Sequence, residues 1–215
     1  MPSHITNKLS APAHVLASMI NEEGHIDFRV LIKFEGDFSW DMICGAAETA
    51  AEAAINLPLS SNPMLASIQR HNRETSSVTK LSDESFEQFM QMLRNHRKCG
   101  HLHDMNFGRQ AWGTKWNAYV QKVDLEDLYL SFDTAWNAPI PIFKALSAPH
   151  PTEEITVVFA DEDIGSNCGT LKLKAGELVE QDCAGSWNGM SEAEQAKWRA
   201  FAMEVTGRTD EDEDE

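Results

Sequence analysis

The sequence predicts an α+β fold in which an antiparallel β-sheet is covered by helices. The first observation is a pair of alternating segments, residues 116–123 and 128–136, joined by a connection so short that the two strands must be antiparallel. The second is the order of elements from residue 116 onward, which reads strand, strand, helix, strand, strand, helix. That order is a circular permutation of the ferredoxin-like βαββαβ pattern. We therefore expect a four-stranded antiparallel ferredoxin-like sheet, permuted and with its helices on one face, preceded by a mainly helical N-terminal region with an inserted loop.

The N-terminal region is expected to span residues 1–111. Its expected elements are short strands over 4–9 and 26–34, a short helix over 15–21, an alanine-rich helix over 40–55 and a helix over 82–97. Residues 57–81 contain two prolines and long polar stretches, so we expect a loop there. The helix over 82–97 has acidic residues in its first turn and basic residues in its last turn, and Gly100 follows it.

The second region is expected to form the sheet over residues 112–208. Its strands are expected over 116–123, 128–136, 155–159 and 171–178, and its helices over 139–146 and 191–205. Prolines suit the first turn of the earlier helix, and Ser191 with Glu194 predicts a capping box for the later one. The last residues, 209–215, are strongly acidic, and we expect them to form a disordered tail.

The stretch AWGTKWNAY, residues 111–119, places two tryptophans beside a glycine, a lysine and an amide. If this stretch is a strand, Trp116 lies on the same face as Phe132 and Trp136, whose rings must be buried against other side chains. We therefore expect Trp116 to anchor the core. Trp112 and Lys115 stand at the entrance of the strand, and the sequence leaves open whether they pack or bind.

Acidic residues are concentrated in the second half of the chain. The net charge is −16 over 215 residues. From Asp124 onward there are 21 acidic and 6 basic residues, a net charge of −15, whereas the preceding residues hold 13 acidic and 12 basic residues. Such a field repels phosphate backbones and suits a basic partner, although acidity can also serve solubility alone.

Four stretches carry a family resemblance: WGTKWNA at 112–118, FDTAW at 132–136, PIP at 139–141 with KALS at 144–147, and ADED-x-G-x-N-x-G at 160–169. In order and spacing they resemble the YubB-type ferredoxin-like domain, a family of uncharacterised phage, prophage and conjugative-plasmid proteins. The opening MPSHITNKL is similar to that family's N-terminal motif, with His4 and Asn7 at the matching polar positions. The resemblance implies a mobile-element accessory protein, of a kind that often counters host defence, and it implies no catalytic residues.

The acidic loop in the last of these stretches supplies candidate partner-binding residues. Taken with the two open positions at the strand entrance, the candidates are Asp161, Glu162, Asp163, Asn167, Trp112 and Lys115. The alternating oxygen-bearing side chains also resemble the front of a calcium loop, but Lys172 stands where that loop needs a bidentate Glu.

The segment HRKCGHLHD, residues 96–104, contains candidate metal ligands. These are His96, Cys99, His101 and His103, all of residue types that bind zinc. Their spacing matches no zinc motif, and the alternative is a basic helix end that runs into a polar loop. The sequence contains no nucleophile motif, phosphate loop or dinucleotide motif, so we expect no catalytic residue and no cofactor.

These observations favour a non-enzymatic binding protein. We expect a counter-defence inhibitor, similar to an anti-CRISPR protein or a DNA mimic, that occupies a basic surface of a host or defence-system complex handling nucleic acid. Two alternatives remain open: a nucleic-acid-binding accessory factor that uses the basic residues of 57–100, and a metal-dependent enzyme acting on a small molecule. Scattered cysteines, the lack of a signal peptide and the lack of a membrane-length apolar run favour the cytoplasm of the host cell and no membrane partner.

Overall fold

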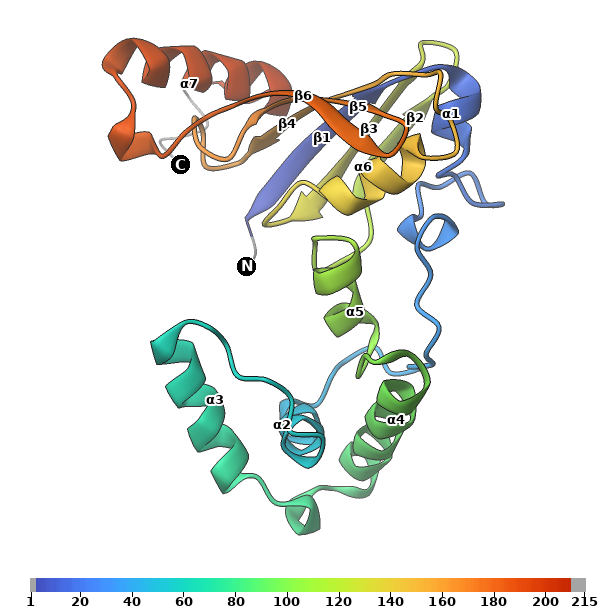
Figure 1. Ribbon diagram of the computed structural model, residues 1–215, viewed down its shortest axis with the longest axis vertical. Helices are drawn as coiled ribbons and strands as arrows, with labels where there is room; N and C mark the ends of the chain where they lie inside the picture. The colour runs from blue at the N-terminus through green and yellow to red at the C-terminus, as the bar shows by residue number, and fades with distance from the viewer. Residues whose placement is uncertain (1–2, 210–215) are drawn as a thin grey trace. The chain divides into compact units, whose positions relative to one another are not determined.

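The computed structural model describes residues 3–209, so most of the expected acidic tail lies outside the described residues. The chain forms two compact units (Figure 1). The sheet unit is Met1–Lys33 with Gly108–Glu215, and the helical unit is Phe34–Phe107. This division differs from the expected boundary after residue 111. The physical reason is that the first strand, β1 (His4–Ser10), is a central strand of the sheet, so the N-terminus belongs to the sheet unit.

The sheet has six strands where four were expected. They run in the order β2-β3-β1-β4-β5-β6, and every neighbouring pair is antiparallel. Besides β1, the strands are β2 (Tyr119–Asp124), β3 (Tyr129–Ala135), β4 (Ile155–Asp161), β5 (Gly169–Lys174) and β6 (Glu177–Cys183).

The expected fourth strand, residues 171–178, is in fact a hairpin. Its turn residues Ala175 and Gly176 have φ values of 53° and 83° and separate β5 from β6. Two consecutive positive φ values are the signature of a tight type I′ turn. Alanine in this conformation is uncommon, so the sequence concealed the turn.

Helices cover both faces of the sheet, which corrects the expectation of a single covered face. The short helix α1 (Ala13–Ala17) and α6 (Ile140–Ser147) pack on one face, where Phe143 of α6 contacts Phe132 of β3. The final helix, α7 (Glu192–Thr206), packs against β4 and β1. It covers Ala160, whose side chain points to the opposite face from that of Phe159 because strand residues alternate. Figure 1 shows α6 and α7 on opposite sides of the sheet.

Residues 26–34 do not form the expected strand. Ile26 makes only an isolated bridge to Ile20, and residues Phe28–Val30 form a 3₁₀ turn, η1. The Asp27 carboxylate caps this turn by accepting a hydrogen bond from the Arg29 amide at 2.9 Å. The side chains of Gln121 in β2 and of Asn117 just before it accept hydrogen bonds from the Ile26 and Phe28 amides, so a strand partner is not required.

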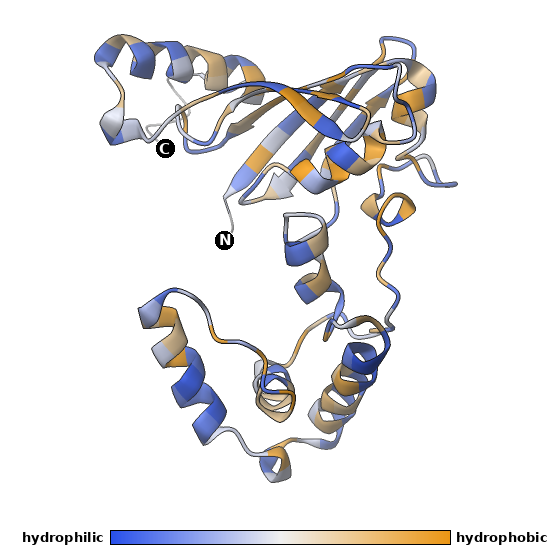
Figure 2. Ribbon diagram, in the orientation of Figure 1, coloured by the Kyte–Doolittle hydropathy of each residue, from blue (hydrophilic) through white to orange (hydrophobic). Residues whose placement is uncertain are grey.

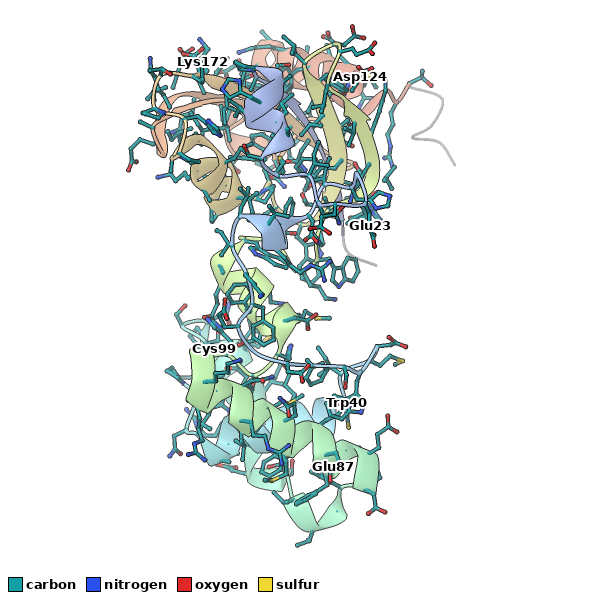
Figure 3. All side chains as sticks on the ribbon, turned by 90° about the vertical axis from the view of Figure 1, so that its right-hand side faces the viewer. Glu23, Trp40, Glu87, Cys99, Asp124 and Lys172 are labelled. Atoms are coloured by element: carbon teal, nitrogen blue, oxygen red, sulfur yellow. The ribbon has the colours of Figure 1, made fainter. Side chains whose placement is uncertain are left out.

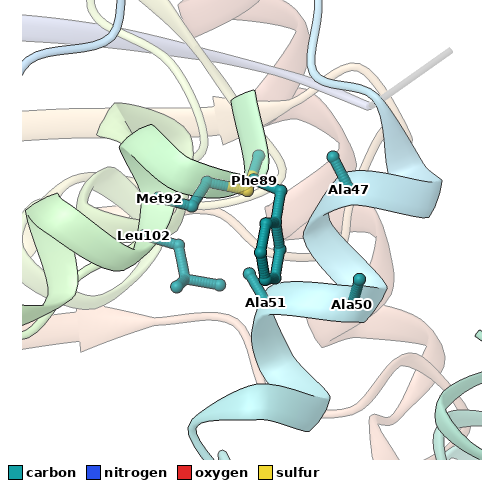
Figure 4. Packing of buried hydrophobic residues seen from close by; sticks show 6 residues of the cluster. All are labelled: Ala47, Ala50, Ala51, Phe89, Met92 and Leu102. Carbon is teal, nitrogen blue, oxygen red and sulfur yellow. The ribbon is translucent and has the colours of Figure 1, made fainter. Parts of the chain in front are cut away.

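The helical unit contains α2 (Gly45–Ala54), α3 (Pro63–Thr75) and α4 (Asp83–Cys99), and α5 (Asp104–Ala111) leads out of it. Short 3₁₀ turns occur at Val78–Lys80 in this unit and at Trp187–Gly189 in the sheet unit. The alanines of α2 pack against α4, with the Phe89 ring lying among Ala47, Ala50 and Ala51 (Figure 4). Small side chains on one helix therefore allow close approach of a large ring on the next.

The expected loop over 57–81 contains a helix. Asn62 caps α3 by accepting hydrogen bonds from the Met64 and Leu65 amides, and Pro63 occupies its first position. Asn62 and Pro63, which are among the residues that predict a loop, are therefore the residues that start a helix. No residue of α3 is buried: its apolar side chains Met64, Leu65 and Ile68 are at least half exposed, and Figure 2 shows both hydrophobic and hydrophilic residues along it. By contrast, the helix expected over 82–97 is confirmed as α4, with a Ser82 cap and a left-handed Gly100.

Candidate functional site

Four segments that are far apart in the sequence meet at one end of the sheet. The Trp136 amide donates to the Ser3 carbonyl, and the Glu162 amide donates to the His4 carbonyl, both at 2.9 Å. The Asn167 side chain donates to the Trp136 carbonyl at 3.1 Å. The start of β1, the end of β3 and the end of β4 therefore share one corner, and the segment before β2 joins them there.

Three residues of the WGTKWNA segment, Trp112, Thr114 and Asn117, anchor it to the rest of the sheet unit through side-chain hydrogen bonds. The Trp112 indole donates to the Ile32 carbonyl at 2.8 Å, and the Thr114 hydroxyl donates to the Ala135 carbonyl at 2.9 Å. The Asn117 amide donates to Asp27 at 2.7 Å. Between these anchors the chain presents Lys115 and Trp116 outward.

Lys115 and Trp116, with Tyr119 and Trp136, form a surface cluster that we name the aromatic corner. Both tryptophans are exposed, and Lys115 and Tyr119 are partly buried. The Lys115 ammonium lies 4.5 Å from the centroid of the Trp116 ring and 5.3 Å from that of Trp136. Trp116 meets the Tyr119 ring edge to face, with centroids 6.2 Å apart. Trp116 is 37% exposed and Trp136 is 45% exposed. A cation at such a ring is worth about 0.5–1 kcal/mol when exposed, so this lysine is held weakly.

Trp136 adopts a backbone conformation that bulky residues avoid. Its φ is 67°, in the left-handed region, where a Cβ costs about 1–2 kcal/mol. The fold maintains this strain by binding both backbone groups of the residue, through Ser3 and Asn167. A strained position of this kind is commonly associated with function, because a glycine or asparagine would be more stable there.

The structure decides the role of Trp112, which the sequence left open, and reverses the role expected for Trp116. Trp112 is buried, with its ring edge-on to Phe28 at 5.8 Å, so it belongs to the core and is no longer a binding candidate. Trp116 was expected to anchor the core, but it is exposed. The reason is that β2 begins only at Tyr119, so the strand alternation does not extend back to Trp116.

The sheet face beside the aromatic corner carries a polar cluster. His4 Nδ1 and the Tyr119 hydroxyl lie 2.9 Å apart, and the Thr6 hydroxyl donates to Asp133 at 3.0 Å. Burial, and then the charges of Asp133 and Glu162, raise the pKa of Tyr119 to about 12. Burial also raises the pKa of Asp133, although its bond from Thr6 acts in the opposite direction. The Tyr119 phenol is therefore neutral at ordinary pH.

The acidic loop, residues 160–169, holds the corner together. The buried Asp161 carboxylate accepts hydrogen bonds from the Asp163 amide at 3.0 Å and from the Asn167 side chain at 2.9 Å, and it bonds the Ser3 hydroxyl. Glu162 accepts from the His4 amide at 3.0 Å. Among the four acidic-loop candidates, the side chains of Asp161, Glu162 and Asn167 thus make structural contacts. Asn167 is nevertheless exposed, as is Asp163. Both carboxylate oxygens of Asp161 accept hydrogen bonds from the protein, so this residue is not placed to coordinate calcium.

The candidate metal ligands are not brought together. His103 is fully buried and uses both ring nitrogens, one with Glu48 at 3.1 Å and one accepting from the Asn106 amide at 3.1 Å. The His101 ring packs edge-on to Phe107, and Cys99 lies on α4 (Figure 3) with its thiol bonded to the Asn95 carbonyl. Within residues 3–209, no group of three or more His, Cys, Asp or Glu side chains is placed to hold a metal ion.

Cys168, which follows Asn167 in the acidic loop, is also unsuited to nucleophilic chemistry. Cys168 is buried beneath α7, and burial raises the pKa of its thiol to about 11, with smaller contributions from Cys183 and Asp161. A protonated, buried thiol is a poor nucleophile.

Within the part of the chain that the structure describes, no helix is both long and apolar enough to cross a membrane.

The sequence reasoning identified Lys115 but missed Trp136 and Tyr119. Trp136 stands at the end of FDTAW, one of the stretches that carries the family resemblance, and this was the available signal. Its positive φ and its proximity to Lys115 depend on tertiary contacts.

The aromatic corner lies in a part of the chain that matches a known family model. Residues 115–200 match the family model described as the ferredoxin-like domain in Api92-like protein. The match starts at Lys115 and spans β2 to β6, while β1, which completes the sheet, lies outside it. A crystal structure of the protein api92 from Yersinia pseudotuberculosis is similar at 10% identity and a TM-score of 0.37, over 86% of this chain and 99% of that one. None of the curated proteins matches the chain.

Proposed function

We propose that this chain, which carries a ferredoxin-like domain of the kind found in Api92-like proteins, is a non-enzymatic binding protein for a basic protein partner. The observation that supports the proposal best is the aromatic corner. Two tryptophans from distant segments stand exposed around one lysine, although the segments that carry them are firmly anchored. Exposed aromatic side chains on a rigid support are typical of protein-binding sites.

The charge of the sheet unit supports a basic partner. The unit contains 24 acidic and 12 basic residues, a net charge of −12, whereas the helical unit contains 10 acidic and 6 basic residues, a net charge of −4. Six of the 24 acidic residues lie in 210–215, outside the described part. Such a field accelerates encounter with positively charged surfaces and opposes approach to a phosphate backbone.

The proposed setting follows from the family resemblance and is separate from the geometry. We propose an accessory protein of a phage or plasmid that acts in the host cytoplasm. There it would occupy the basic surface with which a nucleic-acid-handling defence complex holds its substrate. An acidic protein with an aromatic anchor has the chemistry needed to compete for such a surface.

The two alternatives receive less support from the structure. For a nucleic-acid-binding role through residues 57–100, Arg73 is bound to Glu52 at 3.0 Å, and although Arg70 and Lys80 are exposed, the helical unit carries a net charge of −4, which opposes a phosphate backbone. For a metal-dependent enzyme, the candidate histidines would have to converge, and His103 is already engaged by Glu48 and Asn106.

A capture experiment tests the proposal. Tagged protein is incubated with bacterial host lysate at low and at high salt, alongside the double variant Trp116→Ala with Trp136→Gly and the control Val179→Ala. Val179 is 56% exposed and lies on β6, outside the aromatic corner. We expect a basic protein to be retained at low salt, released at high salt, lost with the double variant and retained with the control. Capture that ignores salt, or that survives the double substitution, contradicts the proposal.

A further inference from the structure

We propose that the Trp116 and Trp136 rings receive an arginine side chain of the basic partner, and that the Lys115 ammonium occupies that place in the free protein. The inference rests on the proposed function, because it names the chemistry that the same site recognises. It starts from one observation: a single ammonium group lies within cation–π distance of two indoles from different segments.

The geometry shows that both rings are receptive to a cation. Trp116 stands before β2 and Trp136 stands after β3, and only the fold brings them to one lysine. Lys115 is half-buried, with its ammonium group over the two rings. A flexible lysine at exposed rings is easily displaced, whereas a planar guanidinium stacks on indoles more favourably.

The charges around the aromatic corner favour arginine over a nucleobase. Sites that stack nucleobases on aromatic rings normally pair them with a positively charged groove for the backbone. Here the Asp161 carboxylate is bonded to Asn167, which bonds the Trp136 carbonyl, and the Asp133 and Glu162 carboxylates lie near enough to Tyr119 to raise its pKa. Glu162, which follows β4, is also paired with Arg208 at 3.5 Å, but the sheet unit as a whole carries a net charge of −12. A guanidinium is therefore attracted by both the rings and the carboxylates, and a phosphate is repelled by the carboxylates.

The conformation of Trp136 gives an independent reason to assign the ring to binding. The residue is strained at φ 67° and is nearly half exposed, so its ring contributes little to the core for the strain it imposes. Retaining a large side chain at such a position makes physical sense when the exposed ring itself makes contacts with a ligand.

The test uses the full chain and peptide probes. The probes are a short arginine-rich peptide, a lysine-rich peptide of the same length and a single-stranded oligothymidylate, and binding is followed by calorimetry and tryptophan fluorescence. We expect the arginine peptide to bind more tightly than the lysine peptide, and the oligonucleotide to bind more weakly than either. Trp136→Gly should weaken arginine-peptide binding about tenfold or more, as expected when an aromatic anchor is removed.

Lys115→Ala gives the result that distinguishes displacement from simple contact. Removing the lysine ammonium from the Trp116 and Trp136 rings should tighten arginine-peptide binding about fivefold, because the peptide no longer competes with the lysine. Lys174→Ala is the matched control, since it removes one exposed positive charge from β5 of the same unit and should change binding much less. If Lys115→Ala weakens binding, or if the two lysine variants behave alike, the displacement model is refuted.

The outcomes separate this inference from the proposed function. If the lysate partner is captured in a salt-sensitive way but the tryptophan variants and arginine peptides behave like the controls, the inference fails and the proposed function stands. If the oligonucleotide binds best, both fail. If the peptides behave as expected but no basic partner is captured, the ring chemistry stands and the proposed function fails.

Discussion

Replacing Trp136 by glycine and, separately, by alanine tests the left-handed backbone on which the aromatic corner depends. Both substitutions remove the indole, so both lose the same ring contacts with Lys115. They differ only in the Cβ. At an ordinary position glycine is less stable than alanine by about 0.5–1 kcal/mol, because its unfolded chain is more flexible. At φ 67° the order should reverse.

The magnitude follows from two opposing contributions. The Cβ of alanine in the left-handed region costs about 1–2 kcal/mol, and the flexibility of glycine offsets about 0.5–1 kcal/mol of that advantage. Trp136→Gly should therefore be more stable than Trp136→Ala by roughly 0.5–1 kcal/mol. For a chain of this size the difference corresponds to a melting temperature higher by about 1–4 °C.

The assay is urea and thermal denaturation followed by circular dichroism, with Val179→Gly and Val179→Ala as the matched pair. Val179 lies on the exposed edge strand β6 without a positive φ, so alanine should be the more stable of the two there. Both Trp136 variants should lose partner binding equally. If Trp136→Ala is as stable as Trp136→Gly, the left-handed conformation is not retained in solution and the strain argument falls.

Four further outcomes are expected. Asp133→Asn should stabilise the protein at neutral pH, because the raised pKa of Asp133 means that its charged form costs stability. The gain should shrink as the pH falls through the raised pKa to the ordinary one, and equal denaturation midpoints across this range would contradict the burial argument. Tyr119→Phe should remove a phenol that titrates at about pH 12 from the ultraviolet absorbance curve, and an unchanged curve would refute the assignment. Ser191→Ala should cost about 1 kcal/mol in thermal denaturation by removing the capping box of α7, whereas no loss would mean that the end of the helix is frayed. A chelator, or added zinc, should leave the melting temperature unchanged, since His103 is engaged by Glu48 and Asn106, and a shift would return the metal hypothesis.

The sequence by itself determined the features that depend on neighbouring residues. The α+β class, the β2–β3 hairpin, α4 with its Ser82 cap and Gly100, and the Ser191–Glu194 capping box were all readable from short stretches. In each, the signal and the structure that it specifies lie within a few residues of one another. A ferredoxin-like domain was also expected from the sequence, and residues 115–200 match a family model of that description.

Only the tertiary structure decided which tryptophans face the solvent. Trp112 is buried because Ile32 and Phe28 come to meet it, and Trp116 is exposed because Asn117 fixes the chain before β2 begins. The same holds for the insertion of β1 into the centre of the sheet and for the helices on both faces. Burial depends on contacts between distant segments, and a short stretch of sequence does not contain them. The aromatic corner is therefore a property of the fold, assembled from segments that the sequence keeps apart.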